Sequence, residues 1–326
     1  MVLTAGAFTT FLSVGLKETL TDLLVTISPR ETPFFSSIGK ITEGLNSRLV
    51  EWQVDALSAG TINSVLEGDA VTLSTAVATT RHTNRCQISN KVYGISHSLR
   101  NANAAGRGDE LAYQRMKAGL ELRTDVEVVL LTNQARTLGT GSAVNLSAGL
   151  PTWITNISTT SGVAATGNGS DTASVTVTTA ITYEQFASAN QLAYVDGGKP
   201  SIFMMTPSNK RAFSLLSFGA APSTADIRYN INRPTPATAV GTVEKVLGDF
   251  GELDIVPNRQ MARQAAAFLR QSCFLIDPER VKVAMYEPFS DFTLGKTGAT
   301  DRGFIEVEYT LVVTAPDAHA AIFGTA

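Results

Sequence analysis

The sequence predicts an α+β fold with two core-bearing regions. Three observations support this prediction. The chain has 326 residues, which is more than the roughly 250–300 at which a single hydrophobic core stops growing. Period-two patterns typical of strands and helical patterns both occur along it. The two kinds of element do not alternate regularly, as they would in a doubly wound parallel sheet.

The composition indicates a surface of low charge. Charged residues make up 17% of the chain, against about 25% in ordinary soluble domains. The formal net charge is −3, so the chain as a whole has no strong attraction for nucleic acid phosphates. Low charge also gives a free monomer little self-repulsion. The composition therefore favours self-association over a basic nucleic acid-binding domain.

The cysteines and the N-terminus suggest where the protein is made. Cys86 and Cys273 are far apart and have no metal-ligand spacing, so we expect reduced thiols in the core. The first residues lack the basic region of a signal peptide, and no apolar run approaches the ~18 residues that cross a bilayer. We expect a soluble product made inside the cell.

Residues 1–45 are predicted to be an extended arm. Pro29 and Pro33 restrict the backbone here. Phe34 and Phe35 follow directly and place two aromatic side chains next to each other. We expect this arm to expose both rings and to dock on another molecule.

Residues 46–98 are predicted to form a projecting β-hairpin. Polar and apolar residues alternate at 46–55 and again at 83–95, which is typical of half-buried strands. The insert between them, 56–80, is rich in Gly, Ser and Thr and contains the turn signal Glu67-Gly68-Asp69. Ordering such an insert costs backbone entropy, so we expect a partner surface to cover it.

A long helix is predicted over 109–133. The segment has no proline and begins with acidic residues, which suit a helix N-terminus. Lys117 with Glu121, and Arg123 with Glu127, have i, i+4 spacing. Apolar residues occupy every face after Val126, so the second half of the helix should be buried.

The remainder of the chain mixes helices and strands. A Gly/Ser/Thr-rich tract at 137–180 is predicted to be loop with a short strand at 175–178. A helix over 182–196 is capped by Thr182 and ends at Gly197. A strand at 201–205 and a helix beginning at 207 follow. Later strands are predicted at 253–257, 274–277, 281–286 and 304–313.

Motifs for catalysis or cofactor binding are incomplete. Gly295-Lys296-Thr297 ends like a phosphate-binding loop, but Ser290 stands where that loop requires glycine. The three histidines are dispersed and no Gly-x-Ser-x-Gly elbow occurs. The carboxylates of 249–254 fit a turn between strands better than a cation site. The sequence predicts no enzyme, no metal and no cofactor.

The order of arm, hairpin, long helix, mixed region and closing strands resembles the HK97-like capsid fold of tailed phages. Residues 28–34, Ser-Pro-Arg-Glu-Thr-Pro-Phe, and residues 50–55, Val-Glu-Trp-Gln-Val-Asp, look like the opening "P-x-x-T-P-F … E-W-x-x-D" of the SU10-like major capsid protein family. These motifs cover about the first sixth of the chain, whereas the element order covers nearly all of it.

The resemblance implies a division of the chain into five parts. These are an N-terminal arm (1–45), an E-loop hairpin with base strands (46–98), a P-domain spine helix with a loop-rich insert (99–180), an A-domain (181–262), and P-domain strands with a C-terminal return (263–326). It also implies a structural subunit that self-assembles into pentamers and hexamers of an icosahedral capsid enclosing phage DNA. An encapsulin-like compartment shell is the alternative with the same fold. A Ser/Thr-rich adhesin would need an export signal, which the sequence lacks.

The resemblance further implies partners and contact residues. The partners are other copies of the chain, a portal, a decoration protein and non-specific contacts with packaged DNA, with no membrane. The location is the virion capsid, after synthesis in the bacterial cytoplasm. A loop over 288–302 would contact neighbouring capsomers. The candidate inter-subunit residues are Pro33, Phe34, Phe35, Trp52, Glu67, Asp69, Phe289, Asp291, Phe292, Lys296 and Arg302.

Two further expectations concern lysines and arginines. Some relatives crosslink an E-loop lysine to a neighbouring asparagine, but this chain has no lysine between Lys40 and Lys91, so we expect a shell without such crosslinks. The basic residues of the helix region are expected on a solvated or subunit-contact face rather than against DNA. They are Arg100, Arg107, Arg115, Lys117 and Arg123.

Overall fold

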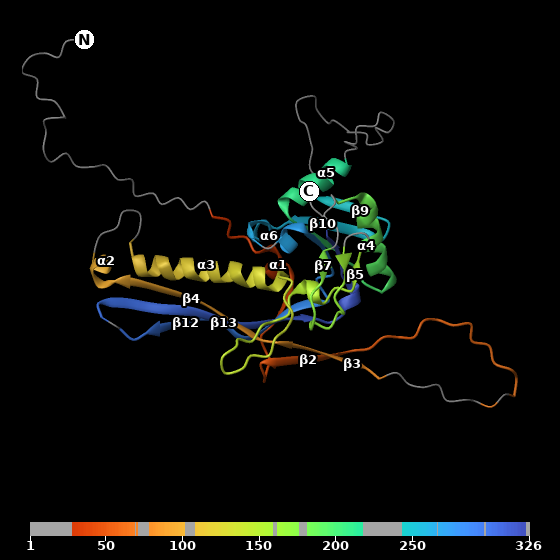
Figure 1. The fold of residues 1–326 in the computed structure, drawn as a ribbon, viewed down its shortest axis with the longest axis horizontal. Coiled ribbons are helices and arrows are strands. Elements are labelled where there is room, and N and C mark those ends of the chain that lie inside the picture. The colour runs from red at the N-terminus through yellow and green to blue at the C-terminus, as the bar shows by residue number, and fades with distance from the viewer. Residues whose placement is uncertain are drawn as a thin grey trace, which may run out of the picture.

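The computed structural model describes residues 28–68, 70, 78–101, 108–158, 162–175, 181–217, 243–265, 267–296 and 298–323. A long helix lies along a four-stranded sheet, and a six-stranded sheet with its own helices lies at one end of that unit (Figure 1). This mixture of helices and sheets confirms the predicted α+β class. The buried apolar side chains form two clusters: the larger includes residues of both sheets, and the smaller lies on the six-stranded sheet.

The four-stranded sheet has the order β1-β12-β13-β4. Its strands are β1 (Gly39–Ile41), β4 (Gln87–Ser96), β12 (Val281–Leu294) and β13 (Thr300–Val313). The β12–β13 pair is antiparallel over nearly its whole length, and β4 pairs with the other side of β13. The sheet thus joins the first third of the chain to its last fifth.

The predicted long helix is α3 (Glu110–Leu131). It begins where the Asp109 side chain accepts a hydrogen bond from the backbone N–H of Leu111 at 2.9 Å. The expected pair between Lys117 and Glu121 forms, at 3.8 Å. The second half of the helix is buried as predicted, through side chains that include Val126 and Leu130.

The six-stranded sheet has the order β5-β14-β11-β8-β10-β9. Its strands are β5 (Asn156–Ile157), β8 (Ile202–Met205), β9 (Lys245–Gly248), β10 (Gly251–Pro257), β11 (Ser272–Ile276) and β14 (Ala320–Phe323). Strand β11 pairs with β8, so this sheet contains strands from both sides of residue 262.

Two helices accompany the six-stranded sheet as predicted. In α4 (Tyr183–Val195), Thr182 and Gln185 form a reciprocal capping box. The second is α5 (Pro207–Ser217). The smaller elements are α1 (Pro33–Ser37), β2 (Leu49–Val54), β3 (Thr80–Arg85), α2 (His97–Asn101), β6 (Gly162–Val163), β7 (Ser174–Val175), α6 (Arg259–Arg263), α7 (Ala267–Gln271) and two 3-10 turns, at Leu150–Thr152 and Pro316–Ala318.

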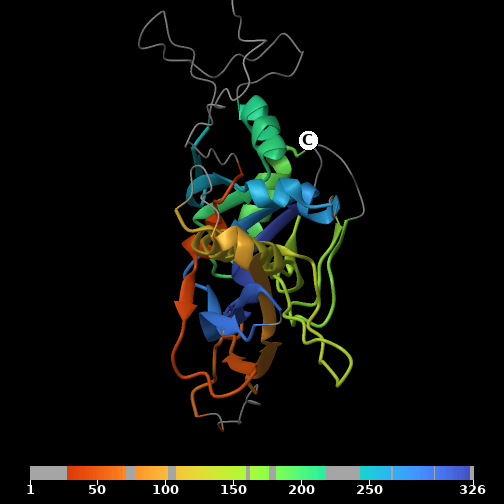
Figure 2. The ribbon, with the colours of Figure 1, turned by 90° about the vertical axis from the view of Figure 1, so that its left-hand side faces the viewer.

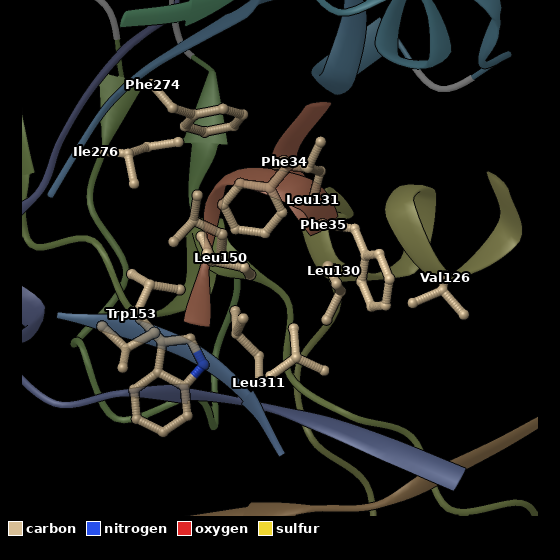
Figure 3. Packing of buried hydrophobic residues seen from close by; sticks show 14 of the residues in the cluster. Phe34, Phe35, Val126, Leu130, Leu131, Leu150, Trp153, Phe274, Ile276 and Leu311 are labelled. Atoms are coloured by element: carbon tan, nitrogen blue, oxygen red, sulfur yellow. The ribbon is translucent and has the colours of Figure 1, made fainter. Parts of the chain in front are cut away.

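The expectation that Phe34 and Phe35 are exposed on the arm is wrong. Both belong to α1 and are 0% and 2% exposed, within the subunit's own core (Figure 3). Their backbone N–H groups donate to the carboxylate of Glu127 at 2.8 and 2.6 Å. Since the first N–H groups of a helix have no intrahelical acceptor, this buried carboxylate holds α1 against α3.

Glu127 therefore has a different role from the one its spacing predicted. It also accepts a hydrogen bond from the Asn258 side chain at 2.7 Å. Arg123, its expected partner, instead donates to the hydroxyls of Thr32 and Ser36. Burial raises the pKa of Glu127, while the hydrogen bonds that its carboxylate accepts from Phe35, Phe34 and Asn258 oppose that shift.

The expected loop over 288–302 is also wrong. Strand β12 continues to Leu294 and β13 begins at Thr300. Irregular register between Met285 and Ser290 accommodates Pro288, which cannot donate to a ladder. Beyond it, Phe292 pairs with Phe304 across the two strands, and their rings stack with centroids 5.2 Å apart. Cross-strand aromatic packing thus extends the strands.

The predicted strand at 83–95 is divided at Cys86. The part before it, β3, pairs with β2, while the part after it, β4, pairs with β13. Cys86 and Cys273 are both free and buried, which confirms the expected core thiols. The division directs the β2–β3 hairpin away from the four-stranded sheet (Figure 1).

Candidate assembly surfaces

The first candidate surface is the projecting arm, which we define as residues 55–68 between β2 and β3. These residues have no regular secondary structure and extend away from the rest of the subunit (Figure 1). Leu57 and Ile62 are 99% and 101% exposed, and Val65 and Leu66 are 73% and 80% exposed. Four almost uncovered aliphatic side chains on one segment are typical of a surface that a partner buries.

The base of the arm is fixed to the subunit. Trp52 on β2 is half-buried, and its ring lies 5.2 Å from that of the buried Trp153 and 6.2 Å from that of His82 on β3. Beside this cluster, the Asn84 side chain donates to the carbonyl oxygen of Leu311 at 2.7 Å and accepts from the N–H of Ala148 at 2.9 Å. The body of the subunit therefore holds the base of the arm.

The second candidate surface is a cluster at the far end of the β12–β13 hairpin. This tip cluster consists of Tyr93, Arg100, Arg115, Asp291, Lys296 and Asp301. Asp301 pairs with Lys296 at 2.9 Å and with Arg100 at 2.6 Å. Asp291 pairs with Arg115 at 2.8 Å and accepts a hydrogen bond from the Tyr93 hydroxyl at 2.6 Å. The cluster joins the hairpin to α2, α3 and β4.

The electrostatics of the tip cluster follow from this pairing. The hydrogen bond from Lys296, followed by that from Arg100, lowers the pKa of Asp301. Burial raises the pKa of Tyr93 to about 12, and its hydrogen bond to Asp291 acts in the same direction. The lowered pKa keeps the Asp301 carboxylate ionised at neutral pH, so its contacts with Lys296 and Arg100 are charge-assisted.

Aromatic side chains surround the tip cluster. Phe289 and Phe292 are 38% and 39% exposed. Phe289 meets the ring of Phe35 edge-on at 6.3 Å. The Arg302 side chain packs directly against the backbone of Gly94. Any side chain at position 94 would be too close, because its Cβ atom would lie 2.9 Å from the Arg302 Cγ. The end of the hairpin thus presents part of two aromatic rings beside a set of paired charges.

The structure brings some of the predicted contact residues together and separates others. Phe289, Asp291, Phe292, Lys296 and Arg302 all lie toward the far end of the β12–β13 hairpin. The other residues are distributed as follows: Pro33 is half-buried at the start of α1, Trp52 lies at the base of the arm, Glu67 is exposed on it, and Asp69 lies outside the described residues.

Sequence reasoning missed the four aliphatic residues of the arm. They are spread through an insert whose Gly, Ser and Thr content suggested a polar loop. Their spacing at 57, 62, 65 and 66 follows neither a strand nor a helix, so periodicity could not find them. The available signal was the occurrence of large aliphatic residues in a loop.

The basic residues of the helix region are partly used within the subunit. Arg100 and Arg115 pair with carboxylates of the hairpin, and Lys117 pairs with Glu121. Arg107 lies outside the described residues. Within the described ranges, His, Cys, Asp and Glu side chains form no group that could hold a metal ion. None of the described helices is both long enough and apolar enough to cross a bilayer.

Solved structures of phage and related capsids have a similar fold. Over 95% of this chain and 96% of the other, it is similar to the capsid of a native GTA particle, with a TM-score of 0.62 and 14% identity. It is also similar to a chain from Gordonia phage Cozz, with a TM-score of 0.59 and 13% identity over 100% and 99% of the two chains. These matches establish the HK97-like capsid fold.

The sequence comparisons point in the same direction. The chain is 27% identical to the major capsid protein of Escherichia phage Phieco32, over 96% of this chain and 95% of that protein. The family model of the SU10 major capsid protein matches residues 3–326. Because this match spans almost the whole chain, the protein belongs to the SU10 major capsid protein family.

Proposed function

We propose that the protein self-assembles into hexamers and pentamers that close an icosahedral capsid around phage DNA. The observation that carries the proposal is the projecting arm, whose aliphatic side chains are 73% exposed or more. An isolated subunit gains nothing from keeping such side chains in water. Membership of a capsid family favours a virion shell over an encapsulin-like compartment.

Two contacts between copies follow from the candidate surfaces. The arm, with Glu67 near its end, would lie on a neighbouring subunit together with Asp69, which follows the arm in the sequence, and Trp52 would hold the base of the arm in place. The tip cluster, with Phe289, Phe292 and Arg302, would meet a neighbouring capsomer. The arm projects from the body of the subunit (Figures 1 and 2), and the tip cluster lies at the end of the β12–β13 hairpin away from the six-stranded sheet (Figure 1). Both positions support a use in assembly.

The proposed parts of the subunit follow the capsid fold. Residues 1–45 would be the N-arm, 46–98 the E-loop with its base strands, and 99–180 the spine-helix part of the P-domain. The A-domain would begin at 181. Of the N-arm candidates, Phe34 and Phe35 are enclosed in their own subunit, so contact with a neighbouring subunit would fall to residues 1–15.

The other partners are also part of the proposal. A shell that holds DNA requires a portal and non-specific contacts with packaged DNA, and a decoration protein would bind its outer face. The protein would act as a structural subunit and not as an enzyme, after synthesis in the bacterial cytoplasm. Its low charge supports many weak contacts between subunits.

Expression of the chain, alone and with its phage partners, tests the assembly. Negative-stain microscopy is expected to show rings of five or six subunits, or closed shells. Size-exclusion chromatography gives the same information in solution. A strictly monomeric product at high concentration, even with the phage partners present, would overturn the proposal.

The shell is proposed to be held without E-loop lysine crosslinks. The chain has no lysine between Lys40 and Lys91, so the arm lacks the amine that such a bond requires. Purified particles boiled in detergent are expected to run as a single subunit band. A ladder of covalent oligomers would contradict this part of the proposal.

A further inference from the structure

An apolar groove runs along the outer face of α3 and has no cover among the described residues. Two cavities, of about 240 and about 800 Å³, share Met116 and Leu120 of this helix. Met116 is 56% exposed. Phe35, Met285 and Phe289 line the larger cavity. A stretch of apolar surface of this kind on a helix is a typical docking site.

Basic side chains form most of the rim of the groove. Residues Arg30, Lys117 and Arg263 line the smaller cavity, and Lys40, Arg115 and Arg123 line the larger one. Two acidic residues, Glu121 and Asp291, also line the cavities, and each is paired with one of these cations. The rim therefore has an excess of positive charge, which favours an occupant with a negative balance.

The first described residues of the chain lie at this groove. Ser28, Pro29 and Arg30 are the first described residues of the N-terminal part, and they form a wall of the smaller cavity. Residues 1–27 are therefore joined to the described part of the chain at the wall of the groove. They contain Lys17 against Glu18 and Asp22, which gives the negative balance that the rim favours.

The sequence next to this point has a pattern that fits the groove. Leucine or isoleucine occurs at 16, 20, 23, 24 and 27, which is the i, i+4, i+7, i+8, i+11 pattern of one helix face. A helix over 16–27 would be about 17 Å long at a rise of about 1.5 Å per residue. The α3 residues that line the groove, from Ala112 to Thr124, span a similar length by the same measure.

We propose that residues 16–27 dock as an amphipathic helix in the α3 groove of their own subunit. The leucines would cover Met116 and Leu120, and the acidic residues would lie toward solvent near the basic rim. Cis docking is favoured because the segment is joined to the wall of the groove by the peptide bond between Ile27 and Ser28. That connection gives it a high effective concentration there.

The rate of Met116 oxidation reports whether residues 16–27 cover the Met116 side chain. Among the described methionines, Met116 is exposed, whereas Met204, Met205, Met261 and Met285 are at most 6% exposed. Unassembled subunits would be treated with dilute hydrogen peroxide, which forms methionine sulfoxide, and analysed by peptide mass spectrometry. Deletion of residues 2–27 is expected to speed Met116 oxidation several-fold. The buried methionines report that each variant is folded.

A matched pair of variants tests the leucine face. The variant Leu16→Ser, Leu20→Ser, Leu24→Ser is expected to oxidise at Met116 as fast as the deletion. The control Thr19→Ser, Thr21→Ser, Thr26→Ser keeps all the leucines of that face, and its Met116 is expected to oxidise as slowly as in the intact chain. Equal rates in the intact and the deleted chains would overturn the proposal.

A disulfide distinguishes the chain's own segment from that of a second copy. The two native cysteines are buried, so a pair made by Leu20→Cys and Met116→Cys should react without competition. Oxidation is expected to give a crosslink within one chain, and Thr21→Cys with Met116→Cys should react more slowly. Crosslinked dimers as the main product would assign the groove to a second copy and overturn cis docking.

Discussion

The side chains of the β12–β13 hairpin and those of the β2–β3 hairpin are covered in different ways. The first lies between β1 and β4 and under α3, so Val307, Tyr309 and Leu311 are fully buried within the subunit. The second is a two-stranded ribbon whose connecting arm leaves Leu57 and Ile62 in water.

The difference shows which contacts belong to the fold and which to assembly. A two-stranded ribbon is marginal by itself, so the packing of Trp52 and the hydrogen bonds of Asn84 are needed to hold its base. The arm beyond that base contributes little to the stability of the subunit. Substitutions in the two hairpins should therefore separate folding from assembly.

The largest expected effect on subunit stability comes from the core of β13. The Leu311→Ala substitution would leave a cavity in a fully buried site and is expected to lower the free energy of unfolding by about 2 to 5 kcal/mol. Urea denaturation of unassembled subunits measures the change. A loss below about 1 kcal/mol would mean that the hairpin is not a central part of the core.

A smaller loss is expected at the base of the arm. The Asn84→Ala substitution would leave the Leu311 carbonyl and the Ala148 N–H without the partners that Asn84 supplies. A buried donor or acceptor that loses its hydrogen bond lowers the free energy of unfolding by about 1 to 3 kcal/mol. The same denaturation experiment measures the effect. If stability is unchanged, the base of the arm is held by its aromatic contacts alone.

The tip cluster should give a pH-dependent effect. Because Lys296 and Arg100 lower the pKa of Asp301, its pairing stabilises the fold above the ordinary carboxyl pKa and is lost as the pH falls through the lowered pKa. The Asp301→Asn substitution should lower the melting temperature at neutral pH. At a pH well below about 4, the variant and the original protein should melt alike. A difference that persists in acid would exclude charge pairing as its cause.

The arm should show the smallest effect on the subunit. Replacement of Leu57, Ile62, Val65 and Leu66 by serine is expected to change the free energy of unfolding by less than about 0.5 kcal/mol. Assembly should nevertheless be lost, as seen by negative-stain microscopy. A matched control is the replacement of Ser58, Thr61 and Ser64 by alanine, which should still assemble. Normal shells from the serine variant would show that the arm is not an assembly contact.

The sequence alone predicted those elements whose signals are local. The α3 helix followed from its acidic start and lack of proline, and the cap of α4 followed from Thr182 and Gln185. Both depend on residues a few positions apart in the chain, so no knowledge of the fold was needed. The family resemblance likewise came from the motifs at 28–34 and 50–55, and the match over residues 3–326 confirmed it.

Tertiary structure decided what depends on distant residues. Phe34 and Phe35 looked like exposed docking groups until Glu127, more than 90 positions later, was found to accept their backbone N–H groups. The family resemblance implied a loop at 288–302, yet β4 and the Phe292–Phe304 stack extend its strands. A local pattern reports the preference of a segment for a conformation, whereas burial depends on which distant residues pack against that segment.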